Sequence, residues 1–189
     1  MNRPNARSEP DPWRVPVMVA HIPDTGLHRK VEASAAERQA MADVAGVRDI
    51  LSAHAAFDVV PKSGGRFHVT GHVRARIGQT CVVTLEPIES EIDEDIDLIF
   101  APEAEVRRLA DLIEEGQDDK EPPEVADPPE AIVNGIIDLG RIATDALFLA
   151  IDPYPRKPGV VFEAEVTAPD PEDNPFAVLK ALQDNKNRQ

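Results

Sequence analysis

The sequence has one cysteine, few aromatic residues and no long apolar run. Its single cysteine, Cys81, excludes a disulfide within the chain and fits a reducing compartment. Six phenylalanines, one tryptophan and one tyrosine in 189 residues predict a lean core. No stretch reaches the length of a membrane-spanning helix, and the N-terminus MNRPNARSEPDPW lacks the apolar segment of a secretory signal. We therefore expect a cytoplasmic protein that does not bind a membrane.

Bases are also scarce. The chain has 20 lysines and arginines against 35 aspartates and glutamates, a formal net charge of −15. An acidic surface repels phosphate backbones and anionic lipid, so the charge alone favours a basic or neutral partner. Residues 102–131 hold eleven acids, three bases and two Pro-Pro pairs, which predicts an acidic flexible insert with a short helix at 103–115.

Catalytic signatures are missing as well. The sequence has no phosphate-binding loop, no nucleophile elbow and no cluster of metal ligands. Cys81 stands in an apolar row with Val83 and Leu85, which indicates a buried structural thiol rather than a nucleophile. We therefore expect no enzyme activity, no cofactor and no metal.

Alternation of apolar and polar residues is the clearest pattern that is present. It predicts antiparallel strands over 50–61, 66–77 and 88–100, each with one buried face, and a hairpin turn at Lys62–Gly65. In the first of these strands the inward residues would be Leu51, Ala53, Ala55, Phe57 and Val59. An edge strand is expected over 13–22 and a short apolar strand over 131–138.

Three helices complete the predicted fold. Ser34 and Glu37 form a capping box for a helix that ends before Gly46, with Ala36, Ala40, Met41 and Val44 on its apolar face. A buried helix is expected over 139–151 and a last one over 175–184. The predicted class is α+β: an antiparallel meander with two or three packed helices, in one domain over 13–189 after a flexible tail at 1–12. The pattern leaves open whether the meander closes into a barrel.

A basic row on the second strand of the meander is the candidate RNA-binding site. It consists of Arg66, His68, His72, Arg74 and Arg76, with Lys62 near the turn. Alternate strand positions lie about 6.8 Å apart, close to one nucleotide step, so this row suits a phosphate backbone. The alternative is pairing across the sheet with an acidic row on the next strand. We favour pairing, because this face lacks aromatic side chains on which RNA bases stack.

The last helix carries a second candidate surface. Phe176, Leu179 and Leu182 share one side of the helix over 175–184. They suit docking on the chain's own domain or in a partner's groove.

Three stretches resemble one known family. TCVVTLEPIESEIDEDIDLIF (80–100), IDLGRIATDALFLAIDPYPRKPG (137–159) and NPFAVLKAL (174–182) resemble, in order and spacing, the YceD-like proteins, also called large ribosomal RNA subunit accumulation proteins, and in particular their alphaproteobacterial branch. Many members carry a paired cysteine near the third strand, whereas Cys81 here is alone, so no metal site is carried over.

The resemblance implies a bacterial accessory protein of ribosome assembly. Its partner would be large-subunit rRNA or a pre-ribosomal particle. The alternative is an acidic adaptor or holding factor for a basic ribosomal protein or assembly factor, without direct RNA contact.

Overall fold

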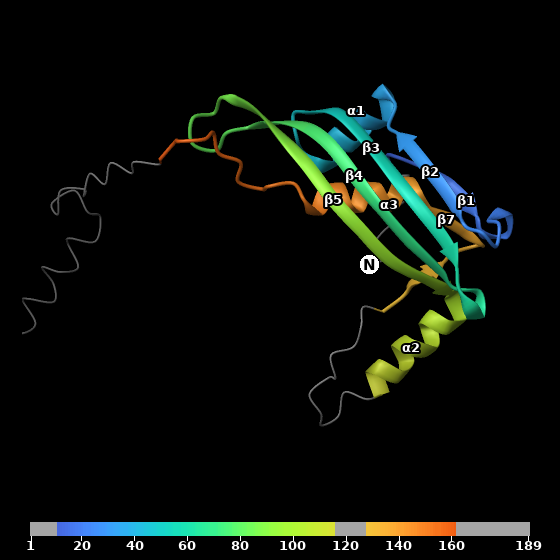
Figure 1. Ribbon diagram of the computed structural model, residues 1–189. Coiled ribbons are helices and arrows are strands. Elements are labelled where there is room, and N and C mark those ends of the chain that lie inside the picture. The colour runs from blue at the N-terminus through green and yellow to red at the C-terminus, as the bar shows by residue number, and fades with distance from the viewer. Residues whose placement is uncertain (1–10, 116–127, 162–189) are drawn as a thin grey trace, which may run out of the picture. The chain divides into compact units, whose positions relative to one another are not determined.

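A computed structural model describes residues 11–115 and 128–161 (Figure 1). The chain divides into two units, Met1–Pro158 and Gly159–Gln189, and the fold below lies in the first. The predicted single domain over 13–189 stays a prediction, because most of the second unit lies outside the described residues. So do the N-terminal tail before residue 11, residues 116–127 of the acidic insert and the helix expected over 175–184.

A five-stranded sheet forms the centre of the fold. Its order is β2 (Leu27–Glu32), β3 (Asp49–Pro61), β4 (Phe67–Thr80), β5 (Pro87–Pro102) and β6 (Glu130–Ile132). The first four strands pair antiparallel, while β6 runs parallel to the end of β5. The α+β class and the meander are confirmed. Among the described residues β2 and β6 do not pair with each other, so the sheet stays open.

Helices cover one face of this sheet. α1 (Ala35–Ala45) packs against β3, and α3 (Leu139–Leu149) packs behind β4 and β5 (Figure 1). α2 (Glu103–Glu115) follows β5 directly. The two short strands β1 (Pro16–Met18) and β7 (Ile136–Asp138) form a separate antiparallel pair, and 3₁₀ turns occupy Val19–His21 and Ser63–Gly65.

Alternate burial along β3, β4 and β5 confirms the predicted meander. The inward residues of β4, Phe67, Val69, Val73, Ala75 and Ile77, are all buried in the core. Leu51 is an exception: its side chain is 41% exposed, while Ile50 is buried. The register shifts between Ile50 and Ser52, so a bulge changes which residue faces inward.

Beyond Thr80 the predicted inward row ends. Cys81 is buried, but the chain then turns and Leu85 is 75% exposed with a φ of +60°. The prediction for Leu85 was wrong because alternation was extended past the end of the strand.

The first helix begins and ends as predicted. Ser34 Oγ accepts from the Glu37 N–H, the Glu37 carboxylate accepts from the Ser34 N–H, and Gly46 has a φ of +67°. Its buried side chains are Met41 and Ala42, whereas Val44 is exposed. Ala36 is exposed as well, so the assignment of Ala36 and Val44 to the apolar face was wrong.

Two predicted strands differ from the observed ones. The strand over 13–22 is reduced to β1, because the chain enters a 3₁₀ turn after Met18. The strand over 131–138 is divided between β6 and β7, which belong to different sheets, by a turn at Asn134 and Gly135. Both turn residues have positive φ, a conformation that asparagine and glycine tolerate best. β2 was not predicted.

The N-terminal segment is hydrogen-bonded to the start of α3. The Asp138 carboxylate accepts from the N–H groups of Gly140 and Arg141 at 3.1 and 3.3 Å, and so caps the helix. The same oxygen accepts from the Val15 N–H at 2.7 Å. A Cβ on Gly140 would lie 2.6 Å from the Trp13 carbonyl oxygen, so this close approach requires glycine.

Candidate interaction surface

The face of the sheet opposite α1 and α3 carries the predicted basic and acidic rows. Successive side chains of a strand point to opposite faces, so alternate residues of β4 line up beside alternate residues of β5. The register places His72 opposite Asp95, Arg74 opposite Asp93 and Arg76 opposite Glu91. The two rows therefore lie next to each other on one surface, which we call the charged face.

The side chains of the two rows meet across the strands, the arginines in ion pairs and the histidines in contacts that are ionic only when the imidazole is protonated. His72 lies between two carboxylates, and Asp93 is shared between His72 and Arg74. The pairs are His68 Nε2–Asp97 Oδ1 at 2.7 Å, His72 Nδ1–Asp95 Oδ1 at 2.8 Å, His72 Nε2–Asp93 Oδ1 at 2.6 Å, Arg74 Nε–Asp93 Oδ2 at 3.0 Å and Arg76 Nη2–Glu89 Oε2 at 2.5 Å.

Acids outnumber bases at the outward positions of the charged face. With imidazoles counted as neutral, the cations at these positions are Lys30, Arg74 and Arg76. The anions are Glu32, Asp58, Glu89, Glu91, Asp93, Asp95 and Asp97. The face is thus net acidic although β4 by itself is basic.

Arg66 and Lys62 stand apart from the row. Arg66 precedes β4 and pairs with Glu105 of α2. The hydrogen bond to Glu105 and the negative charge of that carboxylate raise the pKa of the Arg66 guanidinium. The same hydrogen bond is the main cause that lowers the pKa of Glu105. Lys62 forms no ion pair with any residue in the described part of the chain. The RNA-binding role of all six candidates stays a prediction.

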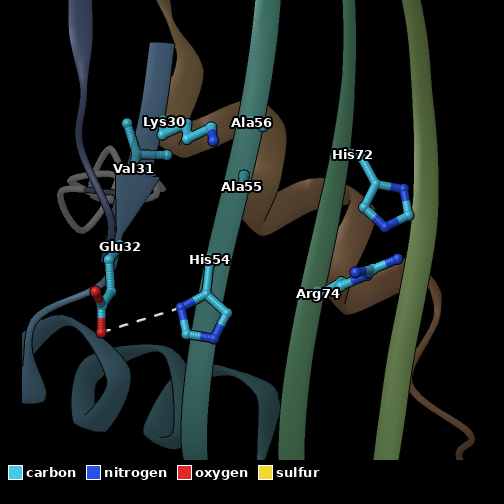
Figure 2. Close-up of a pocket in the computed structure, with 8 residues that line it drawn as sticks. All are labelled: Lys30, Val31, Glu32, His54, Ala55, Ala56, His72 and Arg74. Carbon is cyan, nitrogen blue, oxygen red and sulfur yellow. Dashed lines mark ion pairs between the residues drawn. The ribbon is translucent and has the colours of Figure 1, made fainter.

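An open groove crosses the charged face between β2 and β4 (Figure 2). Its volume is about 500 Å³, and the small side chain of Ala56 lies between Lys30 on one strand and His72 on another. On its β2 side His54 Nδ1 lies 4.0 Å from the Glu32 carboxylate. Charges of both signs line the groove, which suits a charged surface contact. Sequence reasoning missed it, because β2 was not predicted.

A second cluster forms where the turn after β4 meets the segment after α3. Cys81 Sγ accepts from the Lys157 N–H at 3.3 Å and from the Thr84 N–H at 3.5 Å. Hydrogen bonds from Thr84 first, then from the Lys157 and Val83 backbone, lower the pKa of Cys81 to about 6, although burial opposes them. Lys157 also pairs with Glu86 at 2.7 Å. No sequence signal links these residues, because Lys157 lies far along the chain from Cys81.

Other site predictions are not tested by the structure. Phe176, Leu179 and Leu182 lie outside the described residues. Within residues 11–111 and 128–161, no three His, Cys, Asp or Glu side chains are close enough to hold a metal ion. Of the helices in the described ranges, none is both long and apolar enough to cross a membrane.

Comparison with known proteins supports the resemblance carried by the three stretches. The family model described as "Large ribosomal RNA subunit accumulation protein YceD" matches residues 69–183, from β4 onward. No curated protein and no solved structure matches the chain. The alphaproteobacterial branch of the family stays a prediction.

Proposed function

The chain belongs to the YceD family, and on that premise we propose that it supports accumulation of large-subunit rRNA in the bacterial cytoplasm as an accessory protein of ribosome assembly. We propose that it acts by binding and not by catalysis. The arrangement of charges favours an acidic adaptor or holding factor for a basic ribosomal protein or assembly factor. The observation that carries this choice is the neutralised basic row of β4.

A phosphate backbone meets two obstacles on the charged face. It must displace the carboxylates that already pair with His72 and Arg74. Exposed ion pairs contribute only about 0–1 kcal/mol each, so displacing these carboxylates by itself costs little free energy. The displaced carboxylates nevertheless stay on the same face and repel the phosphates at short range. A basic protein meets the opposite situation, because its cations gain the surplus acids as partners and its approach is accelerated by the net charge of −15.

The test is recovery of the tagged full chain from growing cells, with and without nuclease during purification. We expect at least one basic ribosomal protein or assembly factor to remain bound after nuclease treatment. A variant lacking residues 103–130 asks whether the acidic insert holds that partner, since its recovery would then fall. Loss of every ribosomal protein on nuclease treatment would instead mean that RNA holds the complex, and the adaptor mechanism would be wrong.

Direct binding to large-subunit rRNA or a pre-ribosomal particle is the second candidate mechanism. The regular spacing of His72, Arg74 and Arg76 along β4 favours it, as does the ammonium group of Lys62, which has no ion-pair partner among the described residues. Binding to an rRNA fragment should then weaken in the Arg66→Glu/Arg74→Glu/Arg76→Glu variant, with a shallower dependence on salt. An Asp93→Asn/Asp95→Asn/Asp97→Asn variant should bind more tightly, because it removes the competing carboxylates. Absence of RNA binding by the unmodified chain would remove this mechanism.

A further inference from the structure

Within residues 11–115 and 128–161, one long edge of the central sheet has no partner strand. β4 pairs with β5 from Pro87 to Phe100, but on the other side β6 pairs only with the last three residues of β5. From Pro87 to Ile99 no other residue in the described part of the chain pairs with this side of the backbone. Figure 1 shows β5 as the outermost long strand over this length. The free edge is about 40 Å long and offers N–H and C=O groups from roughly every second residue.

The edge is regular, which is unusual for an open edge of this length. Edges are commonly kept short, interrupted by proline or a bulge, or protected by charged side chains, and acidic charge is the device present on β5. Here the register between β4 and β5 is continuous from Phe67↔Phe100 to Thr80↔Pro87, while β3 carries a bulge. Neither proline nor glycine occurs from Ile88 to Ala101. The backbone is thus able to accept an added strand along most of its length.

Charge restricts which strand is able to dock there. All charged residues of the free edge are acids: Glu89, Glu91, Asp93, Glu94, Asp95 and Asp97. Asp95 is 95% exposed, and its only ion-pair partner among the described residues is the imidazole of His72. Within the same residues Glu91 and Glu94 form no ion pair at all. Several negative charges along this edge therefore lack a cationic partner.

A second copy of the chain that docks through its own β5 does not suit this edge, because acids would then face acids across the new strand pair. A strand with lysine or arginine at every second position does suit it, since its cations would face the outward acids of β5 one by one. The other open edge, β2, carries Arg29 and Lys30 and repels such a strand.

We propose that the free edge of β5 is the docking site for an extended basic segment of a partner protein, which adds to the sheet as a further strand. This inference rests on the proposed adaptor function and names its surface and the chemistry of its partner. Backbone hydrogen bonds provide the affinity, and the acids of β5 select for cations at alternate positions.

The test uses the full chain and a synthetic peptide of alternating lysine and valine, with both termini blocked. The control peptide has the same charge but carries N-methyl groups on the backbone nitrogens of two adjacent central residues, so one donor toward β5 is lost whichever of the two faces it. We expect the first peptide to bind roughly tenfold more tightly than the methylated peptide. Equal affinity for the two would overturn strand addition, because it would mean that charge attraction alone holds the peptide.

Matched variants locate the site. Asp95→Lys/Asp97→Lys changes two exposed acids of β5 that pair with histidines. Glu32→Lys/Asp58→Lys makes the same charge change at two exposed acids that also pair with histidines, but on β2 and β3. Peptide affinity should fall roughly tenfold in the first variant and less than about threefold in the second. Equal losses in the two variants would overturn the proposal.

Amide hydrogen exchange supplies a readout that does not depend on the variants. Alternate amides of β5 between Ile88 and Ile99 should exchange quickly in the free chain and become protected when the peptide binds. Protection already present in the free monomer would show that another segment of this chain occupies the edge. Protection that rises with protein concentration would show that a second copy does. Either result overturns the proposal.

Failure of this inference is distinguishable from failure of the proposed function. If Asp95→Lys/Asp97→Lys retains its basic partner after nuclease treatment as well as the unmodified chain does, the adaptor stands and the edge is not its site. If the unmodified chain retains no basic partner, the proposed adaptor function fails first.

Discussion

Replacement of Asp138 by alanine should detach the N-terminal segment from α3 and lower the stability of the whole domain. One carboxylate oxygen of Asp138 caps α3 and also accepts from the Val15 N–H, while the other lies 3.4 Å from Arg14 Nε. The side chain is mostly buried, so water does not replace these bonds freely. Asp138→Ala therefore removes two functions at once.

The expected loss follows from these contacts. Removal of an N-cap costs about 1 kcal/mol. The Val15 N–H, which is partly buried, loses its acceptor at a further cost of about 1–3 kcal/mol. The free energy of unfolding should thus fall by about 2–4 kcal/mol. With a urea dependence of about 2 kcal/mol per molar, the midpoint of unfolding should move down by about 1–2 M.

Urea unfolding followed by fluorescence and by circular dichroism measures this effect. Trp13 is the only tryptophan of the chain and is 1% exposed, so its emission reports directly on the docked segment. Circular dichroism reports on the sheet and helices. If the segment detaches before the domain unfolds, the fluorescence transition will precede the dichroism transition in Asp138→Ala and coincide with it in the unmodified chain.

Two further variants are the controls for this prediction. Asp145→Ala truncates an exposed aspartate of the same helix that pairs with Arg141, and should cost no more than about 0.5 kcal/mol. Asp138→Asn keeps an oxygen that caps well, and should lose about 1 kcal/mol. A midpoint shift in Asp138→Ala no larger than that in Asp145→Ala would refute the reasoning.

Three other predictions concern the thiol, a glycine contact and the charged face. The pKa of Cys81 is lowered to about 6 from about 9, so the free energy of unfolding should rise with pH between about 6 and 9. In urea titrations at several pH values, Cys81→Ser should lose this rise of the unfolding free energy with pH. Gly71→Ala places a Cβ 2.5 Å from Phe57 Cδ1 and should lower the unfolding free energy by about 1–3 kcal/mol; an unchanged melting temperature would contradict this. A double-mutant cycle on Arg74 and Asp93 should give a coupling of about 0.2–1 kcal/mol, and a larger one would show that the pair holds the fold.

The long strands could be predicted from the sequence because each is buried on one side. Burial on one face requires alternation, and alternation over the length of β3, β4 or β5 is hard to mistake. β2 gave no such signal. Its apolar residues are only Leu27 and Val31, and it is held to β3 by backbone bonds that leave no mark on the sequence.

The turn that divides β6 from β7 could have been predicted from the sequence, whereas the strand β2 could not. Asn134-Gly135 is a strong turn signal, but the apolar residues on both sides of it favoured one continuous strand. The bulge at Ile50–Ser52 is different in kind. It depends on how β3 pairs with β4, and a single strand's pattern does not contain that information.

The two charged rows could be predicted, but their individual partners could not. Alternation places the rows on one face, and chain order places β4 beside β5. The sharing of Asp93 between His72 and Arg74 depends on the register of the pair and on side-chain length. The contacts of Arg66 with Glu105 and of Cys81 with Lys157 join elements whose relative position no local pattern encodes.

The energetics of the charged face explain why it is better suited to binding than to holding the fold. β4 and β5 are already joined by a continuous ladder and by buried side chains such as Val73 and Ile96. The exposed ion pairs above them add little, because water and salt screen them. A partner is therefore able to exchange these pairs for its own at small cost to the fold. Glu91, the outward edge acid with no cationic partner among the described residues, has even less structural reason to be acidic. A basic strand beside β5 would give that charge a partner and close the open edge in one step.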